Sequence, residues 1–227
     1  MTAPRVVGQV TLAEGASGGD AESVARALTE RGAEAVGAVR SHAGAHLDLS
    51  VGGGDVTWDL LFADHAEADA FVARMSEGSF DALPDGIHAV EVARPELLAA
   101  ESHRPGLVGV KRTLWLRVEP EAEADAVARF EAETPLLAQA VPAIRNWRWS
   151  RVPSSGTAAT PMRWTHIWEQ EFETVDGLQV DYMSSPVHWG YIDRWFDPEM
   201  PDRIVDLWLA HLACSETEPV LSWDAAS

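Results

Sequence analysis

The feature of this sequence that most limits its fold is an order of strands and helices that occurs twice. In the first half, the apolar periodicity predicts strands at residues 5–14, 39–50, 55–63 and 87–92, with helices at 20–31 and near 66–76. After a loop around residues 94–105, it predicts strands at 108–118, 144–152, 162–172 and 203–212, with helices at 121–137 and 175–183. Both halves have the order βαββαβ, which indicates an internal repeat.

A βαββαβ unit forms a four-stranded antiparallel sheet with both helices on one face, and the other face is left bare. Two such units in one chain can cover each other. The first strand of the second half supports this, because its Arg112 and Leu114 face and its Trp115 face both carry large side chains. The sequence predicts an α+β protein of tandem ferredoxin-like repeats, residues 1–100 and 106–227, that form an intrachain dimeric αβ-barrel.

Charge and composition narrow the classes of function. A formal net charge of −19 at pH 7 argues against nucleic acid and membrane partners, because nucleic acids and anionic membranes are bound by cationic surfaces. No run of about 18 apolar residues and no signal-peptide pattern is present, so a soluble, cytoplasmic protein is expected. A single cysteine, Cys214, excludes an internal disulfide and a cysteine-based metal cluster. Neither a metal ion nor a cofactor is expected.

The segment from Tyr182 to His188 carries the strongest chemical signal. Pro186 is favoured at the first position of a helix and Ser185 at its N-cap, so His188 is expected in the first turn. The positive end of the helix dipole lowers the pKa of a histidine there, and a neutral imidazole can act as a general base. A buried Tyr182 hydroxyl needs a partner, so a purely structural hydrogen bond to His188 is the alternative interpretation.

A second candidate lies on the third strand of the second half. Trp164, His166 and Trp168 alternate along it, and a period of two places them on one face of the sheet. A lone histidine on an apolar strand is commonly a core residue, and this interpretation stays open. Convergence of His166 and His188 on one aromatic cavity would instead favour a small-molecule binding site.

These residues together resemble the stress-responsive dimeric αβ-barrel (Dabb) family, and within it the plant olivetolic acid cyclase. The resemblance covers roughly residues 108–212. It rests on Val110-Lys111-Arg112, Pro142-Ala143-Ile144, Thr165-His166-Ile167, and the segment from Tyr182 to Pro186-Val187-His188. The last motif of the family usually reads His-Pro-x-His, and here Ser185 stands in place of its first histidine.

The resemblance implies roles for individual residues. The Tyr–His catalytic pair of the cyclase falls on Tyr182 and His188, and its strand histidine falls on His166. The histidine of its first strand falls on Arg112, whose fixed charge suits a carboxylate, enolate or phenolate and cannot serve as a base. Two aromatic side chains on a helix line the cavity of the cyclase. Their positions fall on Phe130 and on Thr134, and threonine is the smaller residue. The residues expected to bind substrate are Arg112, Phe130, Trp164, Trp168, Leu114 and Thr134.

The first half lacks this chemistry. Sliding the two halves by 110 residues places Val56 at the position of His166, Val72 at that of Tyr182 and Gly78 at that of His188. The first repeat is therefore interpreted as a scaffold that covers the second.

Three classes of function fit these residues. The first is a cofactor-free cyclase or lyase that acts on an aromatic or polyketide-like molecule, as in antibiotic biosynthesis, with His188 as general base and Tyr182 and Arg112 at the enolate oxygen. The second is a cofactor-independent αβ-barrel monooxygenase that oxidises a phenol to a quinone. The third is a non-catalytic ligand-binding stress protein. Further pairing of the intrachain pseudo-dimer into a homodimer is left open.

Overall fold

The computed structural model describes residues 3–78, 83–103, 106–153 and 164–223. The first half forms a sheet of four antiparallel strands in the order β2-β3-β1-β4, with two helices on one face. Its elements are β1 (Arg5–Leu12), α1 (Gly18–Val36), β2 (Arg40–Ala45), β3 (Val56–Leu61), α2 (His65–Ser76) and β4 (Ile87–Ala93). Helix α1 begins at a reciprocal capping box between Ser17 and Asp20, and it ends at Gly37 in the left-handed conformation (φ 79°).

The second half repeats this plan and adds one strand at the edge of the sheet. The strand order is β5-β7-β8-β6-β9. Its strands are β5 (Glu96–Ser102), β6 (Val110–Leu116), β7 (Ile144–Arg151), β8 (His166–Phe172) and β9 (Ala210–Ser215). Its helical segments are α3 (Ala124–Glu133), α4 (Leu136–Ala140), two short π-helices (Gly177–Tyr182 and His188–Ile192) and the short 3₁₀-helix Asp193–Trp195.

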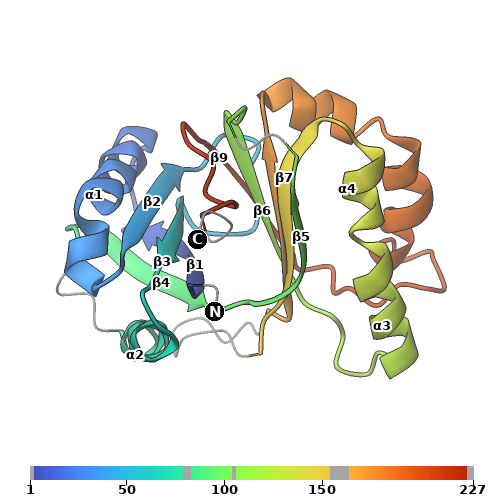
Figure 1. Ribbon diagram of the computed structural model, residues 1–227, viewed down its shortest axis with the longest axis horizontal. Helices are drawn as coiled ribbons and strands as arrows, with labels where there is room; N and C mark the ends of the chain where they lie inside the picture. Colours follow the sequence, from blue (N-terminus) through green and yellow to red (C-terminus); the bar gives the residue numbers. More distant parts are fainter. Residues whose placement is uncertain (1–2, 79–82, 104–105, 154–163, 224–227) are drawn as a thin grey trace.

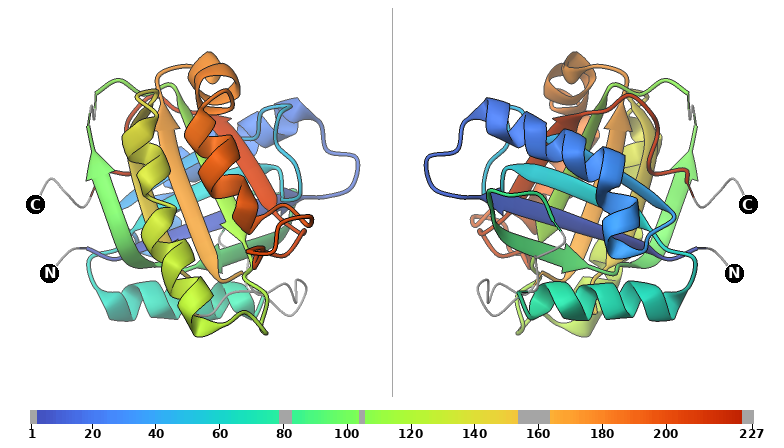
Figure 2. Two further views of the ribbon diagram at one scale, coloured as in Figure 1. Left: turned by 90° about the vertical axis from the view of Figure 1, so that its right-hand side faces the viewer. Right: turned by 90° about the vertical axis from the view of Figure 1, so that its left-hand side faces the viewer.

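The two sheets lie face to face, and the helices cover their outer faces (Figure 1). The two side views in Figure 2 show α3 and the later helical turns over the second sheet, and α1 and α2 over the first. The two halves also meet edge to edge, where His46 pairs with Cys214 and Val51 with His211. The predicted α+β fold of two ferredoxin-like units is confirmed.

Four predicted elements need correction. The loop expected at 94–105 contains β5, because the free edge of β7 offers it backbone hydrogen bonds. The helix expected at 121–137 divides at Pro135, which lacks a backbone N–H. The strand expected at 203–212 is β9 and begins only at Ala210, because the Asp206 side chain accepts a hydrogen bond from the Trp208 N–H in a turn. The helix expected at 175–183 is present at residues 175–182, but it has π-helical geometry from Gly177 to Tyr182.

A fifth difference concerns how the two halves meet. The strand expected at 39–50 leaves the first sheet after Ala45. The following segment, residues 47–51, runs along β9 of the second sheet: the Leu47 N–H donates to the Ala213 carbonyl oxygen at 2.8 Å, and Ser50 Oγ contacts the backbone of the same residue. The Pro-Ser-Ser-Gly-Thr sequence at residues 153–157 predicts a loop, and apart from Pro153 it lies outside the described residues.

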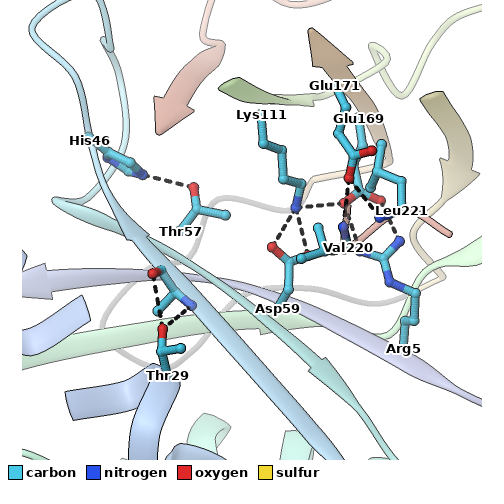
Figure 3. A network of polar contacts seen from close by, with 11 residues as sticks. Arg5, Thr29, His46, Thr57, Asp59, Lys111, Glu169, Glu171, Val220 and Leu221 are labelled. Atoms are coloured by element: carbon cyan, nitrogen blue, oxygen red, sulfur yellow. Dashed lines mark hydrogen bonds and ion pairs between the residues drawn. The ribbon is translucent and has the colours of Figure 1, made fainter. Parts of the chain in front are cut away.

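Between the sheets lies a buried cluster of charges (Figure 3). Lys111 Nζ is 2.5 Å from Asp59 Oδ2 and 3.0 Å from Glu169 Oε1, and Arg5 contacts both carboxylates. Burial alone would lower the pKa of Lys111, but the carboxylates of Asp59 and Glu169 raise it above its usual value. The cluster joins β1 and β3 of the first sheet to β6 and β8 of the second.

No helix among the described residues is long and apolar enough to cross a membrane.

Candidate functional site

A cavity of about 340 Å³ lies between the second sheet and the helical turns that follow β8. Apolar side chains form most of its wall, and Arg112, Tyr182, His188 and His211 bring polar groups into it. The remaining residues of the wall include Leu114, Leu116, Thr134, Trp168, Leu178, Met183, Ile192, Phe196, Leu209 and Ala213. A concave apolar space with a few converging polar groups is typical of small-molecule sites.

Two charged residues line this cavity, Arg112 and Asp193. Arg112 is only 5% exposed. Its Nη1 donates to Gln170 Oε1 at 2.6 Å and lies 3.4 Å from the Tyr182 hydroxyl oxygen. Its Nη2 lies 3.3 Å from His211 Nδ1. All three partners are uncharged acceptors. Within the described ranges Arg112 makes no ion pair, so its positive charge is oriented without being neutralised.

His188 lies where the sequence places it, in the first turn of a helical segment that begins at Pro186. Its ring packs edge-on against Tyr182, with 4.8 Å between ring centroids, and its side chain is 12% exposed. Its Nδ1 is 3.6 Å from Asp193 Oδ1, beyond hydrogen-bond distance. Burial and the charge of Arg112 lower the pKa of His188 to about 4. The direction agrees with the sequence prediction, and its causes are burial and the charge of Arg112.

Tyr182 is fully buried, and burial raises the pKa of its hydroxyl despite the neighbouring charge of Arg112. Its hydroxyl oxygen contacts Arg112, so the expected hydrogen bond between Tyr182 and His188 is wrong. In the part of the chain that the structure describes, Tyr182 meets His188 by ring contact only. A phenol, a neutral imidazole and a guanidinium therefore share one corner of the cavity.

Three of the expected site residues lie away from the cavity. His166 is buried under α3, where it stacks on Trp149 at 4.9 Å and its Nε2 is 3.0 Å from Glu131 Oε1. Phe130 packs among those rings, 5.6 Å from His166 between centroids. Trp164 precedes β8 and packs with Trp115 on the opposite face of the sheet, so the expected single face for Trp164, His166 and Trp168 is wrong. The predicted convergence of His166 and His188 does not occur.

The second histidine of the cavity is His211, which the sequence reasoning missed. On β9 it pairs with Leu114, two pairs along the ladder from the Arg112–Ala213 pair and therefore on the same face. The predicted strand 203–212 contains His211, but periodicity along one strand does not say which face it shares with Arg112. That depends on the register between β6 and β9. Burial, the charge of Arg112 and the nearby His188 lower the pKa of His211 to about 3.

The first repeat also contributes to the cavity, through Leu49 in the segment 47–51. Leu47 and Leu49 pack against the apolar core of the second half. The first repeat is thus a cover for the second sheet that also supplies part of the cavity wall. Among the described residues, no group of three or more His, Cys, Asp or Glu side chains is placed to hold a metal ion.

Comparison with known proteins agrees with this architecture. Residues 110–206 match the family model Dabb, the stress responsive A/B barrel domain, so the second half of the chain contains a domain of this family. The matched range includes Arg112, Tyr182 and His188 and ends before His211. No curated protein sequence matches the chain.

Solved structures share the fold over almost the whole chain. An anthrone oxidase-like protein superposes with a TM-score of 0.60 at 10% identity, with 97% of each chain covered. A candidate monooxygenase from Fusobacterium nucleatum subsp. nucleatum gives 0.55 at 9% identity, covering 96% of this chain and 95% of the other. Another candidate monooxygenase, from Lactobacillus acidophilus, gives 0.51 at 14% identity, covering 97% and 99%. At these identities the likeness establishes the fold alone.

Proposed function

We propose that this chain is an enzyme that removes a proton from an aromatic or polyketide-like small molecule and stabilises the resulting anion. His188 is the general base, and Arg112 and Tyr182 hold the enolate or phenolate oxygen. The observation that carries the proposal is the state of Arg112: a buried guanidinium in an apolar cavity, with uncharged partners only. A buried charge without a counter-ion is costly, and a ligand that becomes anionic during the reaction relieves that cost.

The positions of the three groups support differential stabilisation of the anion. A fixed positive charge in an apolar cavity interacts little with a neutral substrate and strongly with the enolate formed from it. The lowered pKa keeps His188 neutral near pH 7, as a base requires. The same charge that depresses the pKa of His188 therefore makes the substrate more acidic. Aromatic and aliphatic walls, Trp168 and Leu114 among them, suit a flat conjugated ligand.

Two reactions can come after proton removal. In a cyclase, the carbanion attacks a carbonyl carbon of the same molecule, a carbon–carbon bond forms, and the oxygen is protonated. In a monooxygenase, the anion of an anthrone-like ring reacts with O₂: one oxygen atom becomes the new carbonyl of the quinone, and the other leaves as water with the two ring hydrogens. The whole-chain likeness to monooxygenase-type and anthrone oxidase-like proteins favours oxygenation. The Tyr182 and His188 correspondence favours cyclisation.

The test separates proton removal from the later chemical steps. Anthrone in anaerobic deuterated buffer reports proton abstraction by exchange of its acidic methylene hydrogens, and in air it reports oxygenation by O₂ uptake and anthraquinone mass. A linear poly-β-ketone reports cyclisation by the mass and retention of its product. We expect exchange above background with the wild-type protein and its loss in His188→Ala, with the exposed His88→Ala as matched control.

The outcomes are distinct. Exchange with O₂ uptake indicates a monooxygenase, and a new cyclic product without O₂ uptake indicates a cyclase. Identical profiles with and without protein for both probes would contradict an enzymatic role. In that case, ligand affinity that changes in His188→Ala would assign the cavity to a binding protein.

A further inference from the structure

Arg112 and His211 are in contact, and Arg112 can only be the hydrogen-bond donor of the pair. A guanidinium has N–H donors and no acceptor, so His211 Nδ1, 3.3 Å from Arg112 Nη2, must be the acceptor. The ring of His211 is therefore neutral and carries its proton on Nε2. Its lowered pKa keeps it in this form near neutral pH.

The strand register explains why the two side chains can meet. Arg112 lies directly opposite Ala213 on β9, and His211 pairs with the next residue on the same face, Leu114. Because Ala213 has only a methyl group, the guanidinium has room to cross β9 diagonally and reach the imidazole. On the other side, β8 supplies Gln170 to the same guanidinium. Arg112 is thus held between a histidine and a glutamine on the two neighbouring strands.

The backbone of His211 is held by the first repeat. The Val51 N–H donates to the His211 carbonyl oxygen at 2.8 Å, and the His211 N–H donates to the Val51 carbonyl oxygen at 2.9 Å. This reciprocal pair lies at the edge of β9, where a sheet strand would otherwise have free backbone groups. The segment 47–51 therefore determines where the imidazole of His211 lies relative to Arg112.

We propose that His211 is a positioning residue that orients the Arg112 guanidinium in the cavity, and that this makes the cavity selective for ligands with an anionic oxygen. The inference rests on the proposed function for the place of Arg112 and extends it to the class of ligand. An aromatic carboxylate or phenolate bound beside Arg112 gains a charge-assisted hydrogen bond, which an uncharged ligand of the same shape lacks.

The test measures binding of a matched pair of aromatic probes, 2-naphthoate and its neutral analogue 2-naphthamide, by calorimetry at pH 7. We expect the wild-type protein to prefer the carboxylate by about tenfold or more. His211→Leu removes the acceptor, and the preference should fall nearly to one while 2-naphthamide affinity changes less than about twofold. His211→Asn places an amide oxygen near the position of Nδ1, and it should keep the preference to within about threefold. His88→Ala should behave as wild type.

Several results would overturn the inference. These are an equal loss of affinity for both probes in both variants, an unchanged preference in His211→Leu, or no preference for the carboxylate in the wild-type protein. Circular dichroism of His211→Asn shows whether the fold is kept if His211→Leu does not fold. The binding test needs no turnover, so its failure and that of the anthrone exchange test are distinguishable. Probe selectivity that depends on His211, without exchange, would remove the enzyme proposal and keep this one.

Discussion

Arg112 and Tyr182 meet in the cavity wall, with Nη1 3.4 Å from the phenolic oxygen and the guanidinium carbon 5.2 Å from the ring centroid. Because Arg112 donates to this oxygen, the O–H of Tyr182 is available to donate to a ligand. Burial raises the pKa of this hydroxyl, so it stays protonated near neutral pH.

Removing this hydroxyl tests its part in holding the anion. Tyr182→Phe keeps the ring contacts with Phe172 and His188 but loses the donor. We expect the rate of anthrone exchange to fall about tenfold to a hundredfold, as when one donor to a developing oxyanion is lost. The free energy of unfolding should change by only about 1 kcal/mol. Tyr191→Phe, at an exposed tyrosine, is the control, and an equal rate loss there would count against the assignment.

The pH dependence of exchange tests His188 as the base. A base works only when neutral, and burial together with Arg112 lowers the pKa of His188 to about 4. The rate should therefore be constant down to about pH 5 and fall as the pH falls through about 4. Arg112→Leu removes one of the two causes of the lowered pKa, so this acid limb should move to higher pH. A wild-type limb near the ordinary histidine value, about 6.5, would contradict the assignment.

The charge cluster between the sheets predicts a large stability effect. Lys111→Met leaves the carboxylates of Asp59 and Glu169 buried with one cation fewer, at a cost of about 3–5 kcal/mol. Arg94→Met removes a partly exposed pair with Asp69 and should cost less than about 1 kcal/mol. Urea unfolding followed by tryptophan fluorescence measures both. Similar small changes in the two variants would show that the cluster adds little to stability.

A glycine comparison tests how the first repeat holds His211. Gly52 follows Val51 and has a φ of +80°, and a Cβ built there would lie 2.1 Å from the Leu209 carbonyl oxygen. Gly15 has a similar φ of +88° with open space around it. Both alanine variants should lose about 1–2 kcal/mol to backbone strain. Only Gly52→Ala should also lose the preference for 2-naphthoate, because the clash moves Val51 away from His211.

Much of the fold is readable from local patterns. The element order of the first half agrees with the prediction, although the helix expected at 20–31 extends over Gly18–Val36 and the strand expected at 39–50 ends at Ala45. The errors occur where long-range pairing decides the structure. Strand β5 has a weak pattern and exists because β7 has a free edge for it. Residues 47–51 look like the continuation of a strand but pair with the other repeat.

The candidate site divides in the same way. Sequence alone determined the doubled βαββαβ order and singled out Tyr182 and His188, because proline positions, spacing and periodicity are local properties of the chain. Arg112 was singled out by the resemblance to the Dabb family. Only the tertiary structure decided which groups share a cavity. It placed His166 against Glu131 and brought His211 to Arg112. The reason is physical: strand register and the contact between repeats arise from hydrogen bonds between residues far apart in the chain, which no local pattern records.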